Sequence, residues 1–159
     1  MKPKVYLETT IASYLAARPS RDLIVAGHQQ ITHRWWDTRR NAYDLYASTL
    51  VLEEAAEGDP DAAQRRAAVI RTCRMLVIDT EALDRSRALI RAEAVPKKAT
   101  ADSLHIAIAA LNGVDFLLTW NCAHINNADR KPVVESVCAV AGYHCPVICT
   151  PEELMGGVA

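Results

Sequence analysis

Short apolar runs alternate with longer amphipathic segments along most of this chain. The short runs are rich in β-branched and aromatic residues, which favours strands, whereas the longer segments repeat their apolar positions at helical spacing. The expected strands are residues 4–7, 75–78, 115–119 and 146–149. The expected helices are residues 9–15, a segment beginning near 21, and residues 62–73, 81–94, 99–112 and 132–141. This alternation predicts an α/β fold with three layers, in which a central, mostly parallel sheet lies between helices on both faces.

Several element boundaries carry their own signals. Residues 47–52 indicate a brief strand that runs into a helix. Asp59 and Pro60 have the types expected of an N-cap and a first helical residue. Thr9 and Thr10 can cap the first helix, and Thr80 is a candidate cap for the helix after it. Residues 150–153 have capping-box spacing for a short terminal helix.

Three acidic residues stand where an apolar strand ends or the following helix begins: Glu8, Glu54 and Asp102. The carboxyl ends of parallel strands lie along one edge of a sheet, so these side chains are expected in one crevice. Three carboxylates there repel each other unless a cation lies between them. Because hard divalent ions prefer oxygen ligands, the pattern predicts a site for Mg²⁺ or Mn²⁺.

Each acid has a simpler interpretation when it is taken alone. Glu8 can stabilise a helix N-terminus through the helix dipole, and Asp102, in a first turn, can act only as a cap. Glu54 is adjacent to Glu53, and adjacent helical residues point about 100° apart, so only one of them faces the crevice. The metal interpretation therefore depends on the three acids acting together.

Polar residues near these acids are candidate helpers. His105 lies three residues after Asp102 on the same helix face, and its apolar surroundings favour a buried hydrogen-bonding role over direct metal ligation. Asn121 can offer a carbonyl oxygen or position a water, and His124 can serve as a proton shuttle. Either loop residue can instead hydrogen-bond its own backbone.

Length and composition indicate one domain spanning residues 1–159, because 159 residues with 50% hydrophobic content supply one sizeable core. No apolar stretch approaches about twenty residues, so we expect a soluble, cytoplasmic protein without membrane contact. The five cysteines lack a C-x-x-C pair or a zinc-finger spacing. They are expected to be free, mostly buried thiols.

The charge balance does not indicate a dedicated nucleic-acid-binding domain. Lys and Arg number 18 against 19 Asp and Glu, for a formal net charge of −1, whereas such domains are usually strongly basic. Any RNA contact would rest on local patches of two or three basic residues. Such a patch taken alone more often only solvates a helix face. The patches are Arg18 and Arg21; Arg34, Arg39 and Arg40; Lys97 and Lys98; and Arg130 and Lys131.

The segment after Arg21 suggests a contact surface. From Leu23 to Trp35, every fourth residue is apolar or glycine, and Trp36 lies beside the last of them. Such a stripe exceeds what a small sheet needs to cover, so one expectation is a homodimer. The alternative is that both tryptophans pack on Tyr43 and Tyr46 within one subunit.

Four short blocks resemble, in order and spacing, the motifs of PIN domains, the metal-dependent nucleases that include VapC-like toxins. The blocks are VYLETT at residues 5–10, LEEAAEG at 52–58, ADSLHIA at 101–107 and LLTWN at 117–121. The resemblance covers nearly the whole chain and implies a PIN-like fold.

The resemblance assigns Glu8, Glu54 and Asp102 to the first three acidic positions, and Asn121 or His124 to the fourth. Glu54 is preferred over its neighbour because a glycine follows four residues later, as in the family. Two departures stand out: the family usually has Asp at the first position, and its fourth position often supplies another acid. Fewer anionic ligands should weaken metal binding and leave more water on the ion.

The resemblance implies hydrolysis of RNA phosphodiesters by metal-activated water. Glu8, Glu54 and Asp102 would hold Mg²⁺ or Mn²⁺, Asn121 would orient a water or phosphate oxygen, and His105 and His124 would support these groups. A small antitoxin protein is the implied partner. The competing hypothesis is a PIN-like module with little or no activity that binds RNA or a protein. A hydrolase with a nucleophile elbow ranks last, because the chain has no Gly-x-Ser-x-Gly.

Overall fold

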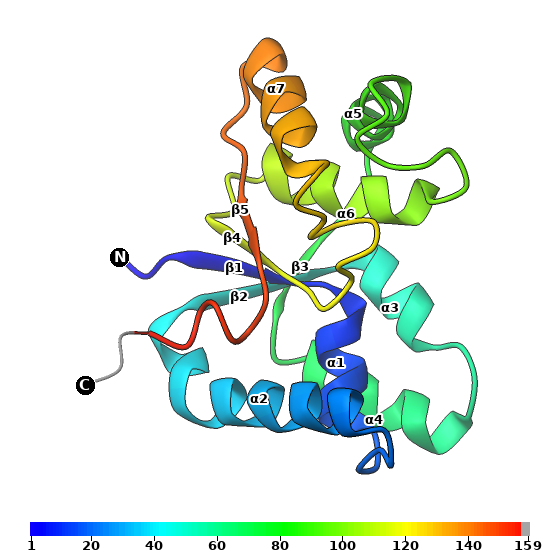
Figure 1. Ribbon diagram of the computed structural model, residues 1–159, viewed down its shortest axis with the longest axis vertical. Coiled ribbons are helices and arrows are strands. Elements are labelled where there is room, and N and C mark those ends of the chain that lie inside the picture. The colour runs from blue at the N-terminus through cyan, green and yellow to red at the C-terminus, as the bar shows by residue number, and fades with distance from the viewer. Residues whose placement is uncertain (157–159) are drawn as a thin grey trace.

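A five-stranded sheet forms the centre of the molecule in the computed structural model, which describes residues 1–156 (Figure 1). Its strands are all parallel and lie in the order β3-β2-β1-β4-β5. Tyr6 of the central strand pairs in register with Tyr46 on one side and Leu117 on the other. The strand bounds are β1 Lys4–Leu7, β2 Asp44–Ser48, β3 Arg74–Leu76, β4 Phe116–Leu118 and β5 Val147–Cys149.

Helices cover both faces of this sheet, which confirms the predicted three-layer α/β/α fold (Figure 1). On one face α1 contacts α2, α3 and α4, and on the other α5 contacts α6 and α7. The helix bounds are α1 Thr9–Ala16, α2 Leu23–Arg39, α3 Thr49–Ala55, α4 Pro60–Ile70, α5 Thr80–Arg91, α6 Thr100–Leu111 and α7 Lys131–Ala141, with a 3₁₀ turn, η1, at Arg40–Ala42. None of the described helices is both long and apolar enough to cross a membrane.

Helix α6 is the most deeply buried helix, and it fixes the position of two candidate site residues. Residues 103–110 are all buried, and the small alanines among them allow the helix to approach its neighbours closely. Asp102 lies in the first turn of α6 and His105 one turn later. Both therefore project from an element that the core holds in place.

Two helices begin with a different cap from the one expected. The Glu8 side chain caps α1 by accepting from the Thr10 backbone N–H, and Asp79, rather than Thr80, caps α5. Asp59 caps α4 and Pro60 follows it, as predicted. An N-cap residue has extended backbone angles while its side chain reaches forward to the free N–H groups of the first turn. At both corrected sites the residue just before the expected cap meets these conditions.

Residues 47–52 contain a strand that runs into a helix, as expected, but the strand begins before residue 47. Strand β2 is Asp44–Ser48, and α3 begins at Thr49. The Ser48 hydroxyl accepts a hydrogen bond from the Val51 backbone N–H, which ends the strand with a helix cap. At the C-terminus, Thr150 and Glu153 make the reciprocal capping-box bonds, but the described residues after them form a turn.

The apolar stripe expected on α2 coincides only in part with the face that this helix buries. Leu23 is 88% exposed, whereas the buried residues are Gln29, Thr32 and Trp35. Trp35 stacks on Tyr43 with ring centroids 5.8 Å apart, and its indole N–H donates to the Leu154 carbonyl. Trp35 is thus a core residue of one subunit. The homodimer stays a prediction, and Trp35, which is buried within one subunit, does not support it.

Candidate metal centre

Glu8 lies at the carboxyl end of the central strand β1 and is only 4% exposed. Its Oε1 accepts hydrogen bonds from the Thr10 backbone N–H at 3.2 Å, the Thr10 hydroxyl at 2.5 Å and the Thr119 hydroxyl at 2.6 Å. Capping of α1 thus accounts for only part of its contacts. Thr119 directly follows β4, so the carboxylate is held between the ends of two neighbouring strands.

Glu54, on α3, is half-buried, whereas Glu53 beside it is exposed. Its Oε1 accepts from the Thr9 hydroxyl and from His105 Nε2, each at 2.6 Å. Burial alone would raise the pKa of Glu54, but the bonds from His105 and Thr9 and the charge of His105 outweigh it and lower that pKa. The carboxylate is therefore ionised at neutral pH, as a metal ligand must be.

His105 is fully buried, and both of its ring nitrogens are engaged. Nε2 contacts Glu54, and Nδ1 lies 2.7 Å from the Tyr6 hydroxyl, which in turn lies 2.8 Å from the Ser48 hydroxyl. An ionised carboxylate only accepts hydrogen bonds, so Nε2 must carry a proton. In the neutral ring, Nδ1 then accepts from Tyr6, whose own pKa is raised by burial. His105 therefore has no free lone pair and orients Glu54 through a hydrogen bond.

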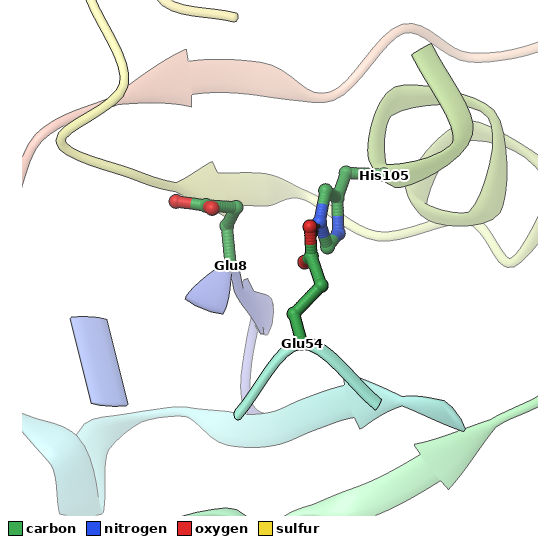
Figure 2. Close-up of side chains that lie close together, drawn as sticks. All are labelled: Glu8, Glu54 and His105. Carbon is green, nitrogen blue, oxygen red and sulfur yellow. Dashed lines mark hydrogen bonds and ion pairs between the residues drawn. The ribbon is translucent and has the colours of Figure 1, made fainter. Parts of the chain in front are cut away.

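Glu8, Glu54 and His105 each offer a possible ligand atom within 4.8 Å of the others, and Figure 2 shows the Glu54 carboxylate against the His105 ring with Glu8 beside them. Within residues 1–156, the hydrogen bonds to Glu8 and Glu54 all go to Oε1. Each carboxylate is thus fixed by one oxygen and keeps Oε2 for a cation. Two oriented carboxylates with open oxygens fit a hard divalent ion.

Asp102 faces the loop after β4. Its Oδ1 accepts from the Asn121 side-chain amide at 3.2 Å, and its Oδ2 lies 3.0 Å from His124 Nδ1. The Asn121 Oδ1 in turn accepts from the His124 backbone N–H at 3.0 Å. These three side chains therefore form a second polar cluster, built from α6 and the loop.

The residues expected at the site thus fall into two neighbouring sets. Glu8 and Glu54 come together with His105, and Asp102 comes together with Asn121 and His124. Among the described residues, Asp102 is not part of the first set, and its role as a metal ligand stays a prediction.

Sequence reasoning missed the hydroxyl groups that orient the acids. Tyr6 and Ser48 support His105, Thr9 supports Glu54, and Thr10 and Thr119 support Glu8. The Thr-Thr pair after Glu8 suggested only helix capping. Tyr6 was hidden in an apolar strand, where alternation predicts burial but gives no partner.

Tyr6→Phe tests whether this chain of hydroxyls fixes the ring of His105. The variant removes the donor to Nδ1, so we expect the ring to lose its single preferred tautomer. The free energy of unfolding should fall by about 1–3 kcal/mol, because buried polar partners lose a hydrogen bond. Long-range ¹⁵N NMR reads the protonation of each ring nitrogen, and the exposed His144 serves as an internal control. An unchanged His105 spectrum would contradict the role of Tyr6.

Comparison with solved structures shows the same fold in VapC proteins. VapC20 of Mycobacterium tuberculosis, described as a Sarcin-Ricin loop cleaving toxin, is 14% identical with a TM-score of 0.57, over 75% of this chain and 91% of that one. A chain of VapBC2 from Rickettsia felis, bound to a DNA fragment from its promoter, is 11% identical with a TM-score of 0.57, over 92% of this chain and 98% of that one. No family model and no curated protein sequence matches the chain. The PIN-like fold predicted from the four blocks is thereby confirmed.

Proposed function

We propose that the protein is a metal-dependent endoribonuclease of the PIN type. The convergence of Glu8 and Glu54 at the carboxyl edge of a parallel sheet carries this proposal, because both are buried or half-buried and each keeps an open oxygen. Two carboxylates held together in a partly dehydrated site repel each other, and a bound cation would offset that repulsion. The fold shared with VapC20, which is described as a Sarcin-Ricin loop cleaving toxin, supports RNA as the substrate.

Glu8 and Glu54 would hold Mg²⁺ or Mn²⁺, and Asp102 would complete the ligand set from the second cluster. A divalent ion bound there would supply an activated water and offset negative charge that develops on the phosphate. Without an imidazole in the ligand set, the donors are oxygens alone, which suits either of these ions.

The remaining residues of the site position groups around this centre. His105 and Thr9 keep Glu54 ionised and aimed, and Asn121 is placed to orient a water or a phosphate oxygen beside Asp102. The His124 side chain is 34% exposed and is oriented by Asp102. It can therefore exchange protons with solvent near the reacting phosphate.

We infer that the protein is the toxin of a type II toxin–antitoxin pair in the cytoplasm. The likeness to a VapBC2 chain supports this inference and a small antitoxin as partner. An exposed RNA loop or single strand is the proposed substrate, by analogy with the activity described for VapC20.

The fourth position favours a second candidate function. Asn121 and His124 stand where the family often has an acid, and both bind Asp102 directly. A site with fewer anionic ligands holds metal more weakly. The alternative is therefore a catalytically weak PIN-like module that binds RNA or a partner protein.

Incubating the purified protein with total RNA, in Mn²⁺ and in EDTA, separates the two functions. We expect cleavage in Mn²⁺ and none in EDTA. Asp102→Asn should lower the rate and the Mn²⁺ affinity by about tenfold or more while the fold is kept, because the volume hardly changes. Asp129→Asn is the matched control, since Asp129 is an exposed acid farther along the same loop. Wild-type cleavage by Asp102→Asn would rule out its proposed role.

A further inference from the structure

Three aromatic side chains from separate segments gather beside the carboxylates. They are Tyr14 on α1, His28 on α2 and Trp120 after β4, and each is half-exposed. The His28 and Trp120 rings stack with centroids 4.0 Å apart and an interplanar angle of 12°. Tyr14 lies 6.5 Å from His28 and 6.2 Å from Trp120, at angles of 26° and 32°. We call these three residues the aromatic cluster.

The aromatic cluster is linked to Glu8 through hydrogen bonds of the Trp120 backbone and through the residue that precedes Trp120. The Trp120 backbone N–H donates to the Thr10 hydroxyl at 2.9 Å, and that hydroxyl donates to Glu8 Oε1. Thr119, directly before Trp120, donates to the same oxygen. Asn121, directly after it, donates to Asp102. Trp120 therefore lies between two residues that contact the site, Thr119 at Glu8 and Asn121 at Asp102.

The indole of Trp120 is also held in one orientation. Its Nε1 donates to the Thr32 hydroxyl at 2.7 Å, and that hydroxyl donates to the His28 carbonyl at 2.6 Å. Thr32 is fully buried. A surface that is rigid before binding loses less conformational entropy when a ligand stacks on it.

The charge of the protein requires an attraction to RNA beyond phosphate contacts. With a formal net charge of −1, the chain lacks the strongly basic surface that gives most nucleic-acid binders their affinity. Stacking of one base on an aromatic side chain contributes roughly 5- to 100-fold in affinity and needs no basic surface. The segment joining α1 to α2 adds two exposed cations, Arg18 and Arg21, between the helices that carry Tyr14 and His28, where they complement a phosphate backbone.

We propose that the aromatic cluster is a stacking surface for an unpaired base of the RNA, adjacent to the nucleotide whose phosphate lies at the carboxylates. This inference rests on the proposed ribonuclease function, and it implies that cleavage is selective for unpaired strands. Bases inside a duplex are stacked on one another and cannot present their faces to a protein ring. Tyr14, His28 and Trp120 are thus positioning residues for the substrate.

Binding of base-bearing and abasic RNA tests the cluster without cleavage. The ligands are a labelled oligoadenylate of about 12 nucleotides, the same backbone without bases, and the oligoadenylate paired with its complement, all in Ca²⁺ so that a divalent ion is present. For the wild type we expect roughly tenfold or greater loss of affinity when the bases are removed, and weak binding of the duplex. In Trp120→Ala, the loss on base removal should be much smaller.

Three further variants keep the test informative about folding and specificity. Trp120→Phe keeps a ring and should recover most of the affinity, while the fluorescence quenching that the oligoadenylate causes in the wild type should disappear. His28→Ala removes the ring that stacks on Trp120, and it takes the place of Trp120→Ala in the test if that variant does not fold. Trp36→Ala is the matched control, because Trp36 is also half-exposed but packs under Arg40, outside the cluster.

The stacking surface would be overturned if removing the bases lowered the affinity equally for the wild type and for folded Trp120→Ala or His28→Ala. It would also be overturned if the duplex bound as tightly as the single strand. If cleavage of RNA still depends on Glu8 in that case, the ribonuclease function stands without it. Conversely, Trp120-dependent binding of unpaired RNA by a protein that cleaves nothing in Mn²⁺ would support the stacking surface and reject the nuclease. Failure of the wild type to bind any of the three ligands would reject the stacking surface.

Discussion

Metal-stimulated RNA cleavage is expected to fall by on the order of 100-fold or more in Glu8→Gln, because the variant removes charge that would hold the ion, and without the ion the attacking water is no longer aligned. The amide keeps the size of the side chain and can still accept from Thr10 and Thr119, so the hydrogen bonds to Oε1 are preserved. What it loses is the negative charge that an ion requires. The rate in Mn²⁺ and the Mn²⁺ affinity from calorimetry measure the effect.

Glu8→Asp and Glu53→Gln complete this series. Glu8→Asp restores the shorter acid that PIN domains usually have, so activity should be kept or raised. Glu53 is exposed on the same helix as Glu54, and its neutralisation should leave the rate nearly unchanged. If Glu8→Gln and Glu53→Gln behave alike in folded protein, Glu8 does not hold the metal, and the non-catalytic alternative gains support.

Glu54→Gln is expected to reduce cleavage by a similar factor, on the order of 100-fold, and also to alter the dependence of stability on pH. Glu54 has a lowered pKa in the folded protein. A carboxyl whose folded pKa is depressed stabilises the fold above its unfolded pKa, and the stabilisation disappears as the pH falls through the folded pKa. The wild type should therefore be more stable than Glu54→Gln at pH 7.

This difference should shrink as the pH falls below 4.5, the ordinary pKa of a glutamic acid. Urea unfolding of both proteins at pH 7 and at acidic pH measures it. Glu53→Gln again serves as the control, and it should show no comparable change. A difference that grows on acidification would mean that His105 and Thr9 do not favour the charged form of Glu54.

The pairing of Glu54 with His105 also bears on the choice of metal. Both nitrogens of His105 are occupied, so an imidazole ligand would require Tyr6 or Glu54 to give up its bond. Imidazole donors favour Zn²⁺ and other transition metals, whereas carboxylates favour Mg²⁺ and Mn²⁺. By holding His105, Tyr6 thus keeps the proposed centre an oxygen site.

The buried cysteines take no part in this centre. Cys73, Cys138 and Cys149 are buried and free, and Cys122 is exposed. Burial raises the pKa of Cys73 to about 11 and that of Cys149 to about 12, so these two thiols stay neutral near pH 7. They act as small core residues, as expected from their spacing.

The pattern of apolar and polar residues is enough to predict the layers of the fold and the edge at which the site lies. Short β-rich runs alternating with helical periods allow few arrangements other than a covered parallel sheet. An acid placed directly after a strand, such as Glu8, must then appear at the carboxyl edge. Exposure of Glu53 and partial burial of Glu54 also follow from the angle between adjacent helical residues.

Packing between segments that are far apart in the chain fixes which polar groups contact each other and which face of α2 is buried. Local spacing placed His105 with Asp102, but packing of α6 against the sheet directs His105 to Tyr6 and Glu54, and leaves Asp102 to Asn121 and His124. Trp35 stacks on the nearby Tyr43, as one alternative expected, but its indole N–H is satisfied by the Leu154 carbonyl from a distant part of the chain. Such partners are separated by many residues, and hydrophobic periodicity, which reports only local burial, contains no information about them.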